Sequence, residues 1–348
     1  MARILYAASG DGYGHAVRAH GVGAGLLARG HDVRFLSCDK TTRYLEPHYP
    51  DRLHHIFGLF TVYNQGRVEP WQTLVHNARR AWSGMGPSNQ AVKSLLRSYE
   101  PDLVITDFEP FAAFWARRFG IPYVSLDNQH LLTHCEVDHP PGFWRDIMNA
   151  YLTVRLYYGG AKRYLITTFI QAPIRYHPTT LVNPILRPHV YAKQPRDGGF
   201  LLAYKGAGGE NDAMREELEK FDRLPIRAYG FGIEGRRKHV EFRPIEADAF
   251  LDDLAGCAGV VTSAGHSLVC ECLHFEKPML LIPIAQQYEQ ILNARHVEKL
   301  GAGKALRRLT GGAMDEFIDG LDGYRASMST LPKASIHPVL DAIEREIP

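Results

Sequence analysis

Short apolar runs alternate with longer amphipathic stretches along nearly the whole chain. The short runs have the character of buried strands, whereas the longer stretches repeat apolar residues at helical spacing. In the first half, strands are expected at 3–8, 32–37, 54–60, 103–106, 123–126 and 164–168, and helices at 15–29, 71–82, 88–99, 111–119 and 143–158. This alternation predicts an α/β fold with parallel sheets.

A second α/β unit is expected after a proline-rich segment, 173–195, which Gly198 and Gly199 close and which is the best linker in the chain. Further strands are expected at 200–204, 226–229, 239–242, 259–262 and 279–284, and helices at 210–221, 247–254, from 266, from 289 and at 335–346. The pattern predicts two doubly wound, Rossmann-like domains, 1–185 and 186–330, and a C-terminal segment, 331–348.

Composition narrows the class of protein. The 348 residues are 45% hydrophobic and 22% charged with a net charge of +2, which is typical of a globular protein and does not favour nucleic acid as a partner. The basic run 236–238 is interpreted as a solvated turn. Five cysteines without a CxxC spacing indicate reduced thiols of a cytoplasmic protein.

A membrane span is not expected, because no window approaches about 18 uninterrupted apolar residues. The N-terminus also lacks the apolar run of a signal peptide. Residues 151–164 mix aromatic side chains with Arg155, Lys162 and Arg163. This mixture fits peripheral contact with the inner face of a membrane, and it equally fits an ordinary, partly exposed helix followed by a strand.

The most informative segment runs from 259 to 294. A strand ends in Ser263-Ala264-Gly265-His266-Ser267, where a helix begins, and the free N–H groups and dipole of such a helix start favour a phosphate or diphosphate. Glu271, six residues past Gly265, lies under two helical turns away and is placed to accept hydrogen bonds from ribose hydroxyls. Glu289 and Gln290, beyond the next strand, would reach sugar hydroxyls in the same crevice. Glycine needed only for helix packing would explain none of these three side chains.

This segment resembles the donor-binding signature of GT-B glycosyltransferases, both the natural-product and glucuronosyl type and the type that makes lipid II. The matching residues are Ser263, Gly265, Glu271, Pro278, Pro283, Gln290, Asn293 and Ala294. Two positions depart from the signature: Glu289 replaces aspartate, and His266 replaces an aromatic or small residue. The resemblance implies two domains facing one another across a cleft, a metal-independent and cofactor-free enzyme, and a last helix that crosses back to the first domain.

The loop after the first strand, 9–15, contains Gly10, Gly12 and Gly14. A dinucleotide fingerprint would need a third glycine where His15 stands, although Asp39 sits where a ribose-binding acid belongs. The string GDGYGHAVRA resembles instead the start of an uncharacterised bacterial and archaeal subgroup of GT-B enzymes. Gly12 and Gly14 would then lie under the donor diphosphate.

His15 is the expected general base, because imidazole is suited to taking a proton near neutral pH. Asp107, at the tip of a neighbouring strand, is expected to orient it, with Glu109 in reserve. Two alternatives stay open. In the first, His15 contacts the donor phosphate without taking a proton. In the second, Asp107 only caps the helix that starts near Pro110.

Several other residues have weaker interpretations. Asn128 and His130, together with Glu109, are assigned to the acceptor; His130 and His134 have zinc-binding spacing, yet no metal is expected. The backbone and side chains of Phe242 and Arg243 would hold the nucleotide base, by resemblance. The loop 205–209 would add donors to the diphosphate.

The predicted function is the transfer of a sugar from a nucleoside diphosphate sugar, with uridine as the expected nucleoside, to a hydroxyl-bearing small molecule, glycan or lipid, with inversion. Two alternatives remain. One is a UDP-sugar 2-epimerase or hydrolase on the same fold, and the other is a non-catalytic protein that binds nucleotide sugars or glycolipids.

Overall fold

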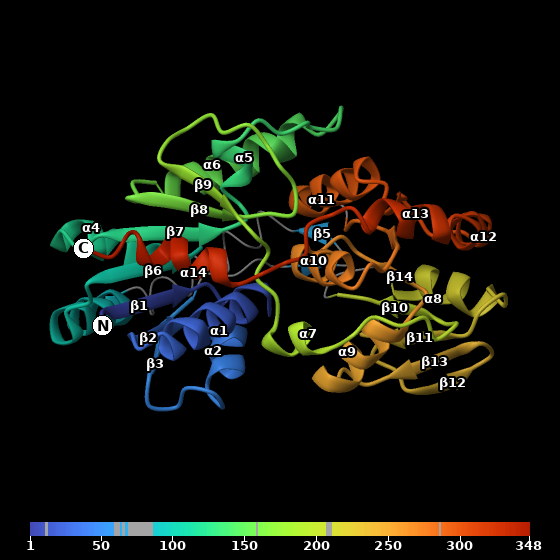
Figure 1. Ribbon diagram of the computed structural model, residues 1–348, viewed down its shortest axis with the longest axis horizontal. Helices are drawn as coiled ribbons and strands as arrows, with labels where there is room; N and C mark the ends of the chain where they lie inside the picture. The colour runs from blue at the N-terminus through green and yellow to red at the C-terminus, as the bar shows by residue number, and fades with distance from the viewer. Residues whose placement is uncertain are drawn as a thin grey trace.

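The computed structural model describes residues 1–10, 13–58, 63–64, 67–68, 86–157, 159–206, 211–284 and 287–348. Within these residues the chain forms two seven-stranded sheets, each in its own lobe, and the lobes lie side by side (Figure 1). The α/β fold class is therefore as predicted. Gly12 and the helix expected at 71–82 lie outside the described residues.

The first lobe has a parallel sheet in the order β3-β2-β1-β6-β7-β8-β9. Its strands are β1 (Arg3–Ala8), β2 (Asp32–Ser37), β3 (Leu53–His55), β6 (Leu103–Asp107), β7 (Tyr123–Asp127), β8 (Arg163–Thr167) and β9 (Thr179–Val182). Its helices are α1 (Tyr13–Ala28), α2 (Asp39–Leu45), one over 86–99, α4 (Pro110–Phe119), α5 (Leu131–His134) and α6 (Trp144–Tyr157), and β4 (Tyr63–Asn64) pairs with β5 (Arg67–Val68). The strand order places the carboxyl ends of β1 and β6 side by side.

The second lobe repeats the plan in the order β12-β13-β11-β10-β14-β15-β16, where β12 is the antiparallel strand. Its strands are β10 (Leu201–Tyr204), β11 (Ile226–Tyr229), β12 (Gly235–Arg237), β13 (Val240–Arg243), β14 (Gly259–Thr262), β15 (Met279–Leu281) and β16 (Gly303–Ala305). Its helices are α7 (Pro188–Ala192), α8 (Asn211–Lys220), α9 (Ala247–Gly256), α10 (His266–His274), α11 (Tyr288–Lys299), α12 (Gly311–Asp319) and α13 (Leu321–Met328), before α14 (His337–Glu344).

Two segments predicted as a linker and as a turn contain short strands, although the part of the proline-rich segment that follows β9 does connect the lobes. The proline-rich segment holds β9, which pairs with β8 at the edge of the first sheet, where prolines on either side of a short strand remove no ladder hydrogen bond. The basic run begins in β12, whose three residues are exposed at the edge of the second sheet, and only Lys238, with φ of 52°, belongs to the turn. Charged side chains on an edge strand protect it from pairing with other chains.

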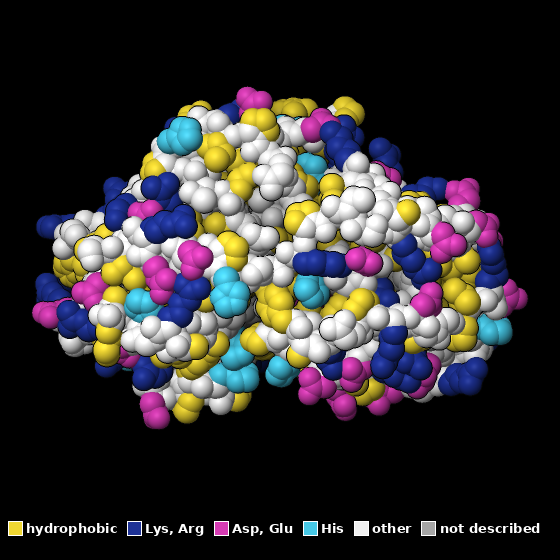
Figure 2. Space-filling view, viewed as in Figure 1, with side chains coloured by type: hydrophobic (Ala, Val, Ile, Leu, Met, Phe, Trp, Pro, Cys, Tyr) yellow, Lys and Arg dark blue, Asp and Glu magenta, His cyan; other side chains and the backbone are white. Residues whose placement is uncertain are grey.

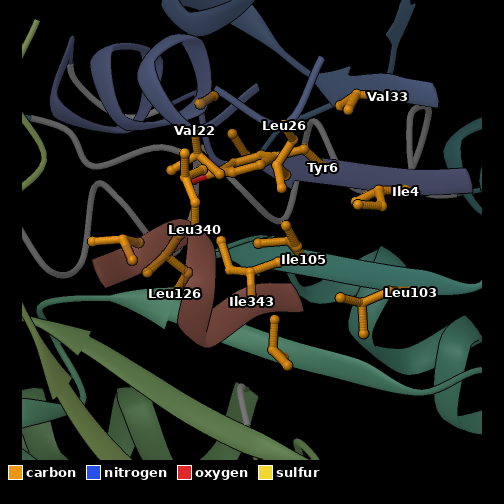
Figure 3. Close-up of a cluster of buried hydrophobic side chains, with 14 of the residues drawn as sticks. Ile4, Tyr6, Val22, Leu26, Val33, Leu103, Ile105, Leu126, Leu340 and Ile343 are labelled. Carbon is orange, nitrogen blue, oxygen red and sulfur yellow. The ribbon is translucent and has the colours of Figure 1, made fainter. Parts of the chain in front are cut away.

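The last helix packs on the first lobe. Leu340 and Ile343 of α14 are buried with Ile4 and Tyr6 of β1 and with Ile105 of β6 (Figure 3). Polar contacts fix the same end of the chain: Arg163 pairs with the Glu346 carboxylate and Lys162 donates to the Glu346 carbonyl. These two basic residues therefore hold the C-terminal segment.

The chain crosses between the lobes twice, after β9 and again after α13 (Figure 1). The crossings lie next to each other, because a single small cavity is lined by residues 182–184 of the first, by 331, 332 and 334 of the second, and by Cys270, Leu273 and His274 of α10. Lys, Arg, Asp and Glu side chains occur on both lobes of the surface in Figure 2. Among the described residues, no helix combines the length and hydropathy needed to cross a bilayer.

We predict that Ile343→Ala lowers the free energy of unfolding by about 2–5 kcal/mol, because the side chain is completely buried and its removal leaves a cavity. Urea unfolding followed by circular dichroism would measure this change. Arg345→Ala, at an exposed position two residues later, is the control and should change stability by less than about 0.5 kcal/mol. Equal effects of the two variants would contradict the packing described for α14.

Candidate active site

The first turns of two helices, one from each lobe, lie close together between the lobes. The first turn of α1 approaches the first turn of α10 so closely that a Cβ on Gly14 would lie 3.0 Å from the Ser267 hydroxyl. A Cβ on Gly265, by contrast, would meet open space. Because both helix starts carry partial positive charge and unpaired N–H groups, their junction favours an anion.

His15 and Asp107 form the expected pair. The His15 Nδ1 atom lies 2.7 Å from the Asp107 Oδ1 atom, and both side chains are buried. The pairing follows from topology: α1 starts directly after β1, and β6 ends beside β1. With Nδ1 bonded to the carboxylate, Nε2 is the ring nitrogen that would take a proton from a substrate.

Arg18 is a third member of this group that the sequence did not indicate. Its Nε donates to Asp107 Oδ2 at 2.8 Å, its Nη2 donates to Oδ1 at 2.7 Å, and Nη2 lies 2.9 Å from His15 Nδ1. The Tyr6 hydroxyl adds a longer hydrogen bond to Oδ2 at 3.4 Å. Burial alone would raise the pKa of Asp107, but Arg18 and then His15 hold that pKa below its ordinary value.

Phe108 packs against His15. The two rings are stacked with centroids 6.3 Å apart, and Phe108 has a φ of 56°. This left-handed backbone is unfavourable for a bulky residue and is common near functional sites. Because Phe108 lies between Asp107 and Glu109, this backbone conformation turns the two carboxylates toward different partners.

Glu109 is the N-cap of α4. Its carboxylate accepts hydrogen bonds from the N–H groups of Phe111 and Ala112 at 3.0 and 2.7 Å. The alternative that Asp107 only caps this helix is therefore wrong, and the assignment of Glu109 to the acceptor is corrected, since its side chain is buried against the helix it caps. Burial raises the pKa of Glu109 to about 7.

Glu271 is buried and forms a two-pronged ion pair with Arg187, with both Nε–Oε1 and Nη2–Oε2 distances at 2.6 Å. Arg187 precedes α7 on the first crossing between the lobes, and its guanidinium lies 5.6 Å from the Phe250 ring centroid. The sequence missed this partner because 84 residues separate the two. The carboxylate proposed for ribose is thus held rigidly from one side.

The two residues predicted for sugar hydroxyls have partners of different kinds. Glu289 accepts a hydrogen bond from the Asn128 side-chain amide of the other lobe at 2.8 Å. Gln290 accepts one from the Ile284 N–H at 3.0 Å, within its own lobe. Further along α11, Asn293 donates to the Ala264 carbonyl at 3.0 Å, which ties α11 to the loop before α10.

His266, at the start of α10, faces several groups of the cleft. Its Nε2 lies 3.5 Å from Cys270 Sγ, and its ring lies 5.7 Å from that of Phe169. Burial, helped by the nearby Arg18 guanidinium, lowers the pKa of His266 to about 3, so the ring is neutral at neutral pH. Ser263, three residues before His266, is half-buried, and its hydroxyl lies near Gly206.

His130 belongs to a second buried cluster. Its Nδ1 lies 2.8 Å from Asp127 Oδ2, which also accepts from the Ser125 hydroxyl at 2.7 Å. Burial opposes ionisation, yet His130 keeps the pKa of Asp127 at about 2. The His130 ring packs against Tyr164 and His134, with centroids 4.7 and 5.0 Å away, so its observed contacts are structural, and its assignment to an acceptor stays a prediction. Within the described ranges, no three ligating side chains converge as a metal site.

The predicted base-binding residues are also corrected in part. The Phe242 ring is buried in the hydrophobic core of the second lobe, with its centroid 5.5 Å from that of Phe231. Only the backbone of Phe242 is therefore available to a nucleotide base. Arg243 pairs with Asp253 and Glu241 at 2.8 and 2.9 Å. Of the loop 205–209, Ala207 and the two glycines that follow lie outside the described residues.

Comparison with known proteins assigns this arrangement to a class. The family description "Glycosyl transferase family 1" matches residues 2–322, and the chain belongs to that family. Structures with the same two-lobed fold include Arabidopsis thaliana UGT89C1, with a TM-score of 0.67, 15% identity and full coverage of both chains. Acinetobacter baumannii MurG has a TM-score of 0.60 and 14% identity over 99% of each chain. The fold is therefore GT-B, as the resemblance implied.

Relatives in sequence include two kinds of transferase. One is the UDP-N-acetylglucosamine–N-acetylmuramyl-(pentapeptide) pyrophosphoryl-undecaprenol N-acetylglucosamine transferase of Geobacillus thermodenitrificans, 36% identical over 120 residues. That match covers 30% of this chain and only 33% of the relative's length. The PGL/p-HBAD biosynthesis rhamnosyltransferase of Mycobacterium bovis is 22% identical over 362 residues, 88% of this chain and 77% of the relative.

We predict that Glu109→Gln leaves sugar transfer within about threefold of the wild type and changes how stability depends on pH. The folded pKa of about 7 lies above the ordinary 4.5, so the folded state binds the extra proton and wild-type stability falls as pH rises from about 4.5 to about 7. The neutral amide should remove this decline, which is on the order of 2–3 kcal/mol. Urea unfolding at pH 4.5, 6 and 7.5 would measure it. A large loss of turnover with an unchanged pH dependence would restore the acceptor assignment.

Proposed function

We propose that this protein transfers a sugar from a nucleoside diphosphate sugar, with uridine as the nucleoside, to an acceptor hydroxyl, with inversion and without a metal ion. The observation that carries the proposal is the junction of the two helix starts beside the buried His15–Asp107 pair. This junction would bring a diphosphate and a proton acceptor to one point between the lobes. Family membership supports the same class of reaction.

The reaction balances without a cofactor. His15 Nε2 takes the proton of the acceptor hydroxyl while that oxygen bonds to the anomeric carbon of the sugar. The bond from this carbon to the diphosphate breaks on the opposite face, and its electron pair leaves with the diphosphate. The start of α10, at His266 and Ser267, would stabilise the charge that develops there.

Donor recognition would use the opposite side of Glu271. Each carboxylate oxygen has two acceptor positions, and Arg187 occupies one on each oxygen. The remaining positions suit the two ribose hydroxyls, in an orientation that Arg187 fixes. Glu289 and Gln290 would form hydrogen bonds with sugar hydroxyls. Asn128, in the acceptor lobe, would orient Glu289 by donating a hydrogen bond to its carboxylate.

For the acceptor and the location, we propose contact with the cytoplasmic face of an anionic membrane through α6. Trp144, Met148 and Leu152 are 66%, 51% and 45% exposed and follow one another at four-residue spacing on one helix face. Arg145 lies against the Trp144 ring, and Arg155 lies against Tyr176, which suits anionic lipid headgroups. The name of the Geobacillus relative includes a lipid-linked acceptor, which favours an acceptor of this kind.

We predict that Glu271→Gln weakens UDP binding by roughly 10–100-fold, because two hydrogen bonds to a charged acceptor are lost or weakened. Isothermal titration calorimetry with UDP and 2′-deoxy-UDP would show it, since the variant should discriminate less between the two nucleotides. Glu216→Gln, an exposed glutamate on α8, is the matched control and should bind as the wild type does.

His15→Ala should instead keep UDP affinity within about threefold and lose about 10²–10⁴-fold in kcat. Release of UDP from a panel of UDP-sugars, with and without acceptors, measures turnover and separates the alternatives. Release without any acceptor indicates a hydrolase, and an epimerised sugar indicates an epimerase. Binding with no turnover indicates a binding protein, and no UDP affinity at all rejects the proposal.

For the membrane contact, we predict that Trp144→Ser, Met148→Ser and Leu152→Ser together reduce partition onto anionic vesicles by about tenfold or more. Co-sedimentation with phosphatidylglycerol vesicles and with phosphatidylcholine vesicles is the measurement. Phe114→Ser, which removes a side chain that is 60% exposed on α4, is the control. Equal partition of the triple variant and the wild type would reject α6 as the contact.

A further inference from the structure

Arg18 lies one helical turn after His15 in α1 and has an exposed fraction of only 4%. It does not act as a surface counterion, because its guanidinium forks onto the completely buried Asp107 through Nε and Nη2. His15 Nδ1 is bonded to the same carboxylate oxygen as Arg18 Nη2. One oxygen atom thus serves both the expected base and a permanent cation.

The three atoms form a triangle that limits where the proton of His15 can be. Asp107 Oδ1 lies 2.7 Å from His15 Nδ1 and 2.7 Å from Arg18 Nη2, and these two nitrogen atoms lie 2.9 Å from each other. Arginine only donates and an ionised carboxylate only accepts. If Nδ1 carries the proton, it donates to Asp107 and Nε2 is free to act as a base. If Nδ1 is bare, it accepts from Arg18, and Nε2 carries the proton and can only donate to a phosphate.

The charges favour the first arrangement, because an unprotonated Nδ1 would point its lone pair at the ionised Asp107 Oδ1 atom only 2.7 Å away. A buried carboxylate that faced a histidine alone would share a proton with it. Loss of that proton would leave the negative charge of the carboxylate uncompensated, so the pair would lose the proton only at a higher pH. With the guanidinium present, loss of the proton from His15 leaves Arg18 and Asp107 as a neutral pair. Asp107 can therefore orient the imidazole while Arg18 compensates the charge of the carboxylate.

We infer that Arg18 is a positioning residue for catalysis: it offsets the charge of Asp107, so that His15 is oriented through Nδ1 and yet unprotonated at Nε2. The inference rests on the proposed glycosyl transfer and assigns to His15 the role of base in place of a phosphate contact. It also explains why an arginine is buried at the point where the two lobes meet, beside Gly14 and His266.

Other charged groups near His15 are accounted for. Tyr6 of β1 bonds to Asp107, Asp127 of β7 acts on Arg18 and Tyr6 at longer range, and His266 of α10 is neutral. Each of these groups is also present in the Arg18 variants. A change in the pH dependence after its replacement therefore reports the guanidinium itself.

The test is the pH profile of kcat/KM for sugar transfer in the wild type, Arg18→Met and Arg18→Lys. Loss of the cation should move the acidic limb of the profile upward by about one pH unit, which lowers the rate about tenfold at a pH on that limb. Lysine retains the charge without the fork, so Arg18→Lys should return the limb toward the wild-type position while kcat stays reduced. Arg29→Met, at the other end of α1, removes an arginine bonded to Asp341 and Glu344 and should not move the limb.

The outcomes separate this inference from the proposed function. An active wild type whose acidic limb is unmoved in Arg18→Met refutes the role of Arg18 alone, even if the rate falls equally at every pH. A wild type that binds UDP but transfers no sugar refutes the proposed function.

A second measurement does not depend on the folding of the Arg18 variants. Nitrogen NMR of selectively labelled histidine in the wild type, with the His15 signals identified by comparison with His15→Gln, reports which ring nitrogen is protonated. The inference requires a protonated Nδ1 and a bare Nε2 near neutral pH. A protonated Nε2 with a bare Nδ1 would mean that Arg18 donates to the ring, and it would overturn the inference.

Discussion

The region where α1 meets α10 is organised around one buried negative charge, that of Asp107. Asp107 has no exposed surface, and a carboxylate removed from water is stable only when hydrogen bonds and cations compensate it. Its partners come from β1 and from the first turns of α1, so β6 and both of these elements must be aligned around it. That alignment sets the position of Gly14, and hence the close approach of α1 to Ser267 in the other lobe.

The same principle holds for Glu271 and Glu289, each of which is oriented by a group from elsewhere in the chain. Glu271 is fixed by Arg187 of the crossing segment, and Glu289 receives the Asn128 amide of the opposite lobe. Asp138 of the first lobe also pairs with Arg295 and Lys299 on α11. The position of Glu289 therefore depends on contacts that exist only when the lobes are close, whereas Glu271 is held by the crossing segment.

Much of the fold followed from the apolar pattern, because a fully buried parallel strand leaves a continuous run. β1, β2, β11 and β14 have the predicted bounds for this reason. β9 and β16 were missed, since short strands near prolines or glycines leave no such run. The pairing of His15 with Asp107 was predictable because parallel strands end at one edge of the sheet. Arg18 was not, because an arginine in a helix gives no sign of burial, and Arg187 meets Glu271 only through the fold.

The two neighbouring crossings have a mechanical consequence. A single tether would leave the lobes free to rotate about any axis, whereas two tethers side by side, around the small cavity at Pro184 and Pro332, restrict their relative rotation. The surfaces that carry His15 and Ser267 are therefore kept opposite one another by two covalent connections as well as by side-chain contacts.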